Sequence, residues 1–354
     1  MQTPARDGGP VPGRDGGPVP ARDGGLVPGE PVSGPGQPVL RVAAGATAAD
    51  RRLAELGVLV VVFLWAGNFV VSKSAIDVLP PIGFAALRFS LASVVLLAVL
   101  RWREGTLRPP RRDLPSMIGL GVLGFGIYQI LWVTALRSIS AGDSSLLIAA
   151  TPVLTALLAV AIGTDALTPA KLGGALVSFL GVAIVVGVDA GLDLGRSLGG
   201  DLLTLAAALC WAIYTAFGAT VLRRHSPLAT TTWTVVFGTL VLAPIGAVEL
   251  AGQPAPGAAI AAVVPAILYS GLLSAGLPNV AVFHAVKLLG PTRVTAFQFL
   301  VPAIAIALAA VFLAEPVRLG QVAGGAVIVA GVLMTRREAF VPTAVRRLAA
   351  RGGS

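Results

Sequence analysis

The chain has 354 residues, of which 55% are apolar and only 12% are charged, and its mean hydropathy is +0.85. An average soluble domain carries about 25% charged residues, so this composition excludes disorder of the whole chain, a disulfide scaffold and a typical soluble enzyme. The net charge of +9 does not indicate nucleic-acid binding, because the basic residues lie in the terminal segments or between apolar runs. The single cysteine, Cys210, lies inside an apolar run and has no partner for an internal disulfide. Most of the chain is therefore expected in a lipid bilayer.

Residues 1–53 differ in composition from the rest of the chain. The tetrapeptide Arg-Asp-Gly-Gly recurs at Arg6, Arg14 and Arg22, Gly and Pro dominate, and aromatic residues are absent. Such a segment cannot bury enough apolar surface to offset the entropy of ordering it. We predict a disordered cytoplasmic tail at 1–53 and a basic cytoplasmic tail at 336–354.

Apolar runs of the length that crosses a bilayer begin near residue 56. A spanning helix needs about 20 mainly apolar residues, and the runs are continuous rather than alternating, which excludes a β-barrel. The sequence predicts an all-α integral membrane fold with ten transmembrane helices. The predicted spans are residues 56–76, 81–100, 115–136, 143–163, 171–188, 201–222, 228–248, 263–286, 292–313 and 318–335.

The basic residues predict the orientation of these spans. With the N-terminus in the cytoplasm, 21 Lys and Arg residues fall on the cytoplasmic side and four on the outside, and Arg88 is left within a span. Cytoplasmic loops carry an excess of Lys and Arg. We therefore predict a multi-pass protein of the plasma (inner) membrane with both termini in the cytoplasm.

The two halves of the chain align with each other without gaps at a shift of 150 residues. The polar, Pro and Gly matches are Pro152 with Pro302, Asp165 with Glu315, Gly174 with Gly324, and Gly181 with Gly331. Each half holds five predicted helices, and five is odd, so the halves face opposite ways across the membrane. We predict two inverted five-helix repeats, at 54–188 and 189–335. Inverted repeats are typical of secondary transporters, whose substrate site lies between the halves near the bilayer midplane.

Short motifs at matching positions carry a family resemblance. They are the run Leu64-Trp65-Ala66-Gly67-Asn68-Phe69, then Pro80-Pro81 with Leu87-Arg88-Phe89, Ala135-Leu136-Arg137, and Ala314-Glu315-Pro316 followed by Gly324 and Gly331. Over about residues 56–335 the sequence resembles the EamA-type transporters of the drug/metabolite transporter superfamily. The resemblance implies a ten-helix bundle with a central cavity that exports or exchanges small metabolites or, in some members, drugs. Asp165 stands where the family usually has Glu.

Arg88 is the most informative candidate site residue. It lies seven residues into its span, about 10 Å deep at the helical rise. A charge at that depth costs at least about 2.5–3.5 kcal/mol, so Arg88 is expected to face other helices or a water-filled cavity. It either anchors an anionic group, such as a substrate carboxylate, or bonds structurally to helix-end carbonyls or Asp77.

Other polar and aromatic side chains in the spans repeat at helical spacing and are expected to turn inward. Some of them line a cavity, while others hold helices together. The cavity candidates besides Arg88 are Trp65, Asn68, Tyr128, Gln129, Trp132, Trp211, Tyr214, Asn279, His284 and Gln298.

Pro152 and Pro302 interrupt equivalent helices and are the hinge candidates, with static kinks as the alternative. The Gly-rich spans 171–188 and 318–335 are expected at the periphery, packed closely through small residues such as Gly174 and Gly324.

The sequence indicates no enzyme, metal site, cofactor or nucleic-acid partner. It has two histidines, no HExxH pattern and no mid-span carboxylate. We predict a secondary transporter that moves a small metabolite (amino-acid-like or another small organic solute) or a drug outward by alternating access. The alternatives are an importer or exchanger of the same fold, or a membrane-embedded enzyme or receptor. A homodimer is left open.

Overall fold

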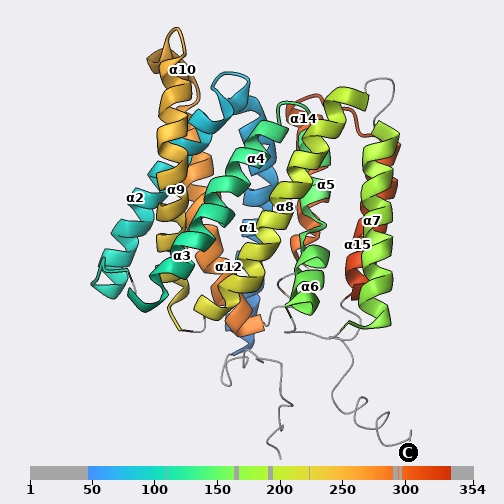
Figure 1. Cartoon of the computed structure of the whole chain (residues 1–354), viewed down its shortest axis with the longest axis horizontal. Helices are drawn as coiled ribbons and strands as arrows, with labels where there is room; N and C mark the ends of the chain where they lie inside the picture. Colours follow the sequence, from blue (N-terminus) through green and yellow to red (C-terminus); the bar gives the residue numbers. More distant parts are fainter. Residues whose placement is uncertain are drawn as a thin grey trace, which may run out of the picture. The chain divides into compact units, whose positions relative to one another are not determined.

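The structure is a computed structural model, which describes residues 47–109, 111–162, 167–189, 194–222, 224–289, 294 and 297–335. All the regular secondary structure in these residues is helical (Figure 1). The predicted tail residues before 47 and after 335 lie outside this part of the chain, as does Asp165. The predicted all-helical fold class is confirmed.

Eight helical segments are long and apolar enough to cross a membrane, and two shorter apolar helices follow them. The eight segments overlap the first eight predicted spans and the shorter helices overlap the last two, so ten crossings stay a prediction. The unbroken helices are α1 (Ala48–Ile76), α2 (Pro81–Glu104), α7 (Pro169–Asp189), α8 (Leu194–Leu222), α9 (Pro227–Ala251) and α15 (Leu319–Thr335). The others are the 3₁₀ turn η1 (Arg111–Asp113), α3 (Leu114–Gly121), the π-helix η2 (Val122–Ile127), α4 (Tyr128–Ala135), α5 (Ala141–Ile148), α6 (Thr151–Ala161), α10 (Pro256–Ala262), α11 (Val264–Leu268), the π-helix η3 (Tyr269–Gly276), α12 (Leu277–Leu289) and α14 (Leu300–Phe312).

The first helix begins earlier than predicted. The prediction of a disordered segment over 1–53 is wrong for residues 48–53, which form the first turns of α1. The physical reason is a capping box: the hydroxyl of Thr47 accepts from the amide of Asp50 at 3.1 Å, and the Asp50 carboxylate accepts from the amide of Thr47 at 2.9 Å. These two bonds satisfy amide hydrogens that a helix start otherwise leaves without partners.

Both hinge candidates follow a break in the helical path. A turn at residues 149–150 separates α5 from α6, and Pro152 lies in the first turn of α6. Pro302 lies in the first turn of α14, after a turn at Phe299. Proline has no amide hydrogen, so it is tolerated at the start of a helix and not in the interior. The breaks are features of the structure, and movement at them stays a prediction.

The helices α2 and α9 pack side by side along their length (Figure 1). They run antiparallel, because the carboxylate at the end of each helix bonds to the start of the other. Glu249 accepts from the amide of Gly83 at 2.9 Å, and Glu104 accepts from the hydroxyl of Ser226 at 2.5 Å. Between these ends, the hydroxyls of Ser93 and Thr239 share a hydrogen bond of 2.9 Å.

The helices α7 and α15 form a second close antiparallel pair (Figure 1). A Cβ atom built on Gly174 would lie 2.5 Å from the carbonyl oxygen of Gly331, and one built on Gly181 would lie 2.7 Å from that of Gly324. Only glycine permits this backbone approach. The opposite side of α7 is exposed at residues such as Leu176 and Leu180, as expected for a peripheral pair.

The largest buried apolar cluster gathers aromatic side chains from α1, α2, η2, α4 and α8. Its buried aromatic members are Phe69, Phe84, Phe89, Phe125, Trp132 and Tyr214. Because these elements pack on one another, the cluster encloses the polar residues that α1, α2 and α4 carry at the same level.

Candidate functional site

Arg88 is enclosed by this aromatic cluster. Only 1% of its surface is exposed. Within the described part of the chain, no carboxylate pairs with it. A buried cation without a counter-ion is costly, so its other partners decide how it is held.

Two amide oxygens hold the guanidinium. Its Nη1 donates to Oδ1 of Asn68 at 3.2 Å, and its Nη2 donates to Oε1 of Gln129 at 2.6 Å. Both acceptors are neutral, so they orient the charge without cancelling it. The Nε atom is buried and has no hydrogen-bond partner among the described residues.

Aromatic faces complete the surroundings of Arg88. The guanidinium carbon lies 4.8 Å from the ring centroid of Phe89, 5.3 Å from that of Trp132 and 5.5 Å from that of Phe84. At these distances the negative ring faces attract the cation. The site therefore combines one positive charge, amide oxygens and flat apolar surfaces.

Further aromatic contacts extend from Trp132 to α8. Tyr128 stacks on Trp132 with a centroid distance of 6.4 Å and contacts Trp211 at 5.3 Å. Trp211 in turn contacts Tyr214 at 5.0 Å. The π-helix η2 directly precedes Tyr128, so the irregular turn sets how this side chain and Gln129 are presented.

The structure brings together seven of the predicted cavity residues and leaves four apart. The connected set is Asn68, Arg88, Tyr128, Gln129, Trp132, Trp211 and Tyr214. Trp65 instead donates to the carbonyl of Ser274 at 3.2 Å, and Asn279 donates to that of Ala275 at 3.0 Å. Gln298 is half-buried and His284 is exposed.

The sequence analysis missed Phe84 and Phe89 as neighbours of the Arg88 charge. The available signal was their spacing on the same helix: Phe84 precedes Arg88 by four residues and so lies on the same face. Phe69 was also missed; its ring meets that of Trp132 edge-on at 5.5 Å.

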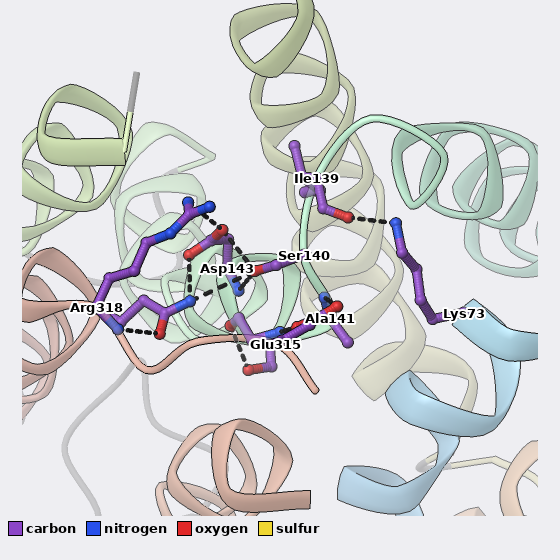
Figure 2. A network of polar contacts seen from close by, with 10 residues as sticks. Lys73, Ile139, Ser140, Ala141, Asp143, Glu315 and Arg318 are labelled. Atoms are coloured by element: carbon purple, nitrogen blue, oxygen red, sulfur yellow. Dashed lines mark hydrogen bonds and ion pairs between the residues drawn. The ribbon is translucent and has the colours of Figure 1, made fainter. Parts of the chain in front are cut away.

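A second polar cluster lies where α5 begins (Figure 2). We call it the Glu315 network, made of Lys73, Ser140, Asp143, Glu315, Arg318 and Gln321. Glu315 accepts from the amides of Ala141 at 3.0 Å and Gly142 at 3.4 Å, in the first turn of α5. The preceding residue, Ala314, has a positive φ of 53°, and this turn carries Glu315 toward α5.

The remaining contacts of the Glu315 network join α1 and α15 to the same end of α5. Asp143 accepts from Ser140 at 2.5 Å and from Gln321 at 2.9 Å, and Arg318 lies 4.0 Å from its carboxylate. Lys73 donates to the carbonyl of Ile139 at 2.8 Å (Figure 2). It also donates to the carbonyl of Leu136. Charged groups from distant parts of the sequence therefore connect α1 and α15 to the start of α5.

Comparison with known proteins identifies the family. The EamA-like transporter family matches residues 52–187 and, a second time, residues 198–337. The chain belongs to the EamA-like transporter family. The predicted family, the internal duplication and the transporter class, as opposed to an enzyme, are confirmed.

Relatives with curated names agree with this family. A probable terminal-alkyne amino-acid exporter of Streptantibioticus cattleyicolor is 32% identical over 289 residues, which cover 79% of this chain and 95% of the relative. An uncharacterized transporter of Archaeoglobus fulgidus is 28% identical over 274 residues, covering 77% and 93%. An S-adenosylmethionine/S-adenosylhomocysteine transporter of Chlamydia trachomatis is 31% identical over 165 residues, covering 46% and 50%.

A solved crystal structure shares the fold. It superposes with a TM-score of 0.56 at 22% identity, over 86% of this chain and 99% of that chain. This superposition shows the shared fold, while the family match and the long apolar helices indicate a multi-pass membrane protein of the EamA-like transporter family.

Proposed function

We propose that this EamA-like protein is a secondary transporter that moves a small organic solute with a carboxylate group, such as an amino acid, outward across the plasma membrane. The observation that carries the proposal is Arg88: a fully buried guanidinium held by neutral oxygens, with an Nε donor that has no partner among the described residues. An importer or exchanger of the same solute remains the alternative.

A carboxylate would supply the negative charge and the hydrogen-bond acceptor for Nε that Arg88 lacks among the described residues. A guanidinium binds a carboxylate through two parallel N–H donors, and the Nε edge offers such a pair with Nη2. Nη2 carries two hydrogens, so it can donate to Gln129 and to a carboxylate at the same time. The negative charge of the solute would then offset the cost of burying the cation.

The aromatic side chains suit the rest of such a solute. Tyr128, Trp132 and Trp211 offer flat apolar surfaces to its side chain, and the oxygens of Asn68 and Gln129 offer acceptors to an ammonium group. Because Arg88 is enclosed in this structure, side chains or helices must move before a solute reaches it. That requirement agrees with alternating access.

The packing of the helices supports two inverted five-helix repeats. The second helices of the halves, α2 and α9, run antiparallel to each other, and so do the fifth helices, α7 and α15. Equivalent contacts also exchange between the halves: α1 packs on α12 and α14, as α8 packs on α4 and α6. The π-helices η2 and η3 occur in the third segment of each half.

The remaining parts of the proposal rest on charge and on relatives. The excess of Lys and Arg on one side supports an orientation with both termini in the cytoplasm. The proposed spans are ten, divided between repeats at 54–188 and 189–335. The exporter name of the Streptantibioticus relative favours outward transport. Pro152 and Pro302, which follow the breaks in α5–α6 and before α14, are the proposed hinges.

The test is transport by the purified protein in liposomes, using amino acids and their carboxamides as matched pairs. The pair differs only in the carboxylate, so a solute that Arg88 anchors is carried as the acid and not as the amide. Equal transport of acid and amide across the panel, or transport of neither, would contradict the proposal.

A further inference from the structure

A groove separates α3 from α8 at the end where α3 begins and α8 finishes. It has a volume of about 360 Å³. Its walls are mainly apolar and include Leu120 from α3, Leu123 from the adjoining η2, and Ile213 and Phe217 from α8. None of the residues that hold Arg88 lines it, so the groove is separate from the proposed solute site.

The absence of a side chain at Gly119 opens this groove. A Cβ atom built on Gly119 would meet nothing within 4 Å. Ser116, Gly119, Phe217 and Thr220 are all exposed. In a chain whose long helices are apolar enough to cross a membrane, an exposed aromatic side chain such as Phe217 faces lipid rather than water.

The mouth of the groove carries positive charge. Arg224 pairs with Asp113 at 2.8 Å, yet about half of its side chain stays exposed, and His225 contacts the other oxygen of Asp113 at 2.7 Å. Arg111 and Arg112 are exposed directly before Asp113. Arg224 lines the groove, Arg111 and Arg112 directly precede its lining residue Asp113, and the Asp113 carboxylate is already engaged by two partners, so the mouth favours an anion.

Polarity changes along the groove in the order that a phospholipid requires. The arginines at the mouth match a phosphate headgroup. The hydroxyls of Ser116 and Thr220 come next and match the glycerol esters. Leu123 is ten residues beyond Asp113, about 15 Å deeper at the helical rise, and with Phe217 it matches an acyl chain.

We propose that the α3–α8 groove binds an anionic phospholipid of the membrane, with its phosphate at the arginines of the mouth and one acyl chain between the two helices. Basic pockets between membrane helices bind anionic headgroups by the same physics. A water-soluble anion would fill the mouth only and would leave the apolar walls uncovered. The lipid would brace α3 against α8 where the two helices separate.

Native mass spectrometry of the full-length protein from nanodiscs of phosphatidylcholine and phosphatidylglycerol tests this proposal. The wild type is expected to retain phosphatidylglycerol in preference to phosphatidylcholine. Gly119→Trp fills the groove and should remove the retained lipid. Gly57→Trp is the matched control, because Gly57 is another exposed helical glycine with nothing within 4 Å of a built Cβ atom. Both variants replace glycine in a helix, which favours folding.

Charge variants test the headgroup separately. Each arginine near an anionic headgroup contributes about fivefold to binding, so Arg111→Gln with Arg112→Gln should lower the preference for phosphatidylglycerol about 25-fold. Arg101→Gln with Arg103→Gln removes the same charge from the neighbouring helix end and should leave the preference unchanged.

Three outcomes would overturn the proposal. They are equal retention of the two lipids by the wild type, retention of phosphatidylglycerol by Gly119→Trp, and an unchanged preference in Arg111→Gln with Arg112→Gln.

Discussion

Glu315→Gln should weaken the contact between Glu315 and the first turn of α5, and so favour separation of the helices that the Glu315 network connects. The carboxylate accepts two amide hydrogens of the first turn of α5, at 3.0 and 3.4 Å. Glutamine has nearly the same shape, but it keeps one neutral acceptor and loses the charge. A hydrogen bond to a charged group contributes about 1.5–3 kcal/mol against about 1 kcal/mol for a neutral one, and a negative charge at a helix start adds about 0.3–1 kcal/mol.

Together these differences amount to about 2 kcal/mol, which is about a 30-fold change in an equilibrium constant. If this end opens and closes during transport, the contact exists only in the closed state. The substitution then raises the population of the open state by that factor, as long as the closed state predominates.

Thiol labelling measures this opening. Cys210, the single native cysteine, is replaced by Ala, and Ser145→Cys places a thiol on α5, at a position with 2% exposure one turn beyond Ala141. An impermeant maleimide should label this thiol about 30 times faster when Glu315→Gln is added.

Glu249→Gln is the matched control. Glu249 also accepts an amide hydrogen from the start of a helix, that of Gly83 at 2.9 Å, but it joins α2 to α9. It should leave the labelling rate unchanged. Unchanged labelling in Glu315→Gln, or an equal increase in Glu249→Gln, would refute the idea that the Glu315 network holds this end closed.

Three further predictions concern the packing of α7 on α15, the orientation in the membrane and the coupling of transport to protons. Gly174→Ala should lower the melting temperature in detergent, because its Cβ atom would lie 2.5 Å from the backbone of α15, and overpacking costs about 1–3 kcal/mol. Gly173→Ala is the control and should be tolerated, because its Cβ atom meets only the tip of Met334 at 3.8 Å. Equal melting temperatures of the two variants would contradict the close packing. In the background without Cys210, Gln253→Cys should react with an impermeant thiol reagent outside whole cells and Thr106→Cys should not; the reverse pattern would overturn the proposed orientation. Solute efflux down its gradient should proceed from proteoliposomes without a pH gradient and persist in His284→Gln, because no carboxylate lies near the middle of a predicted span. Strict dependence on an imposed pH gradient, with uphill accumulation of the solute, would show proton coupling instead.

Local pattern was sufficient to predict the helical segments and much of the Arg88 cluster. Apolar runs of about 20 residues specify helices whatever packs against them, and helical spacing placed Tyr128 and Trp132 on one face. The burial cost of a charge indicated that Arg88 turns inward, and the structure encloses it.

Features that depend on the approach of distant segments were not predictable in the same way. Glu315 caps a helix that begins 174 residues earlier in the chain, and no spacing rule relates the two. Asn279 satisfies its amide on its own helix, and His284 is exposed, because a polar residue in a span gives no direction until the neighbouring helices are placed. The early start of α1 was visible as the Thr47–Asp50 capping pair, but the Gly/Pro-rich composition of the preceding residues obscured it.

Solute counterflow in proteoliposomes, comparing the wild type with Arg88→Gln, tests whether Arg88 binds the solute carboxylate. Glutamine retains donor and acceptor groups for Asn68 and Gln129, so insertion and the melting temperature should stay close to those of the wild type. Removing one partner of a buried charge pair costs about 2–5 kcal/mol, so exchange of the acid should fall by at least about 30-fold. Normal exchange in the folded variant would contradict the anchor role, and failure of the variant to fold would show that Arg88 serves the structure alone.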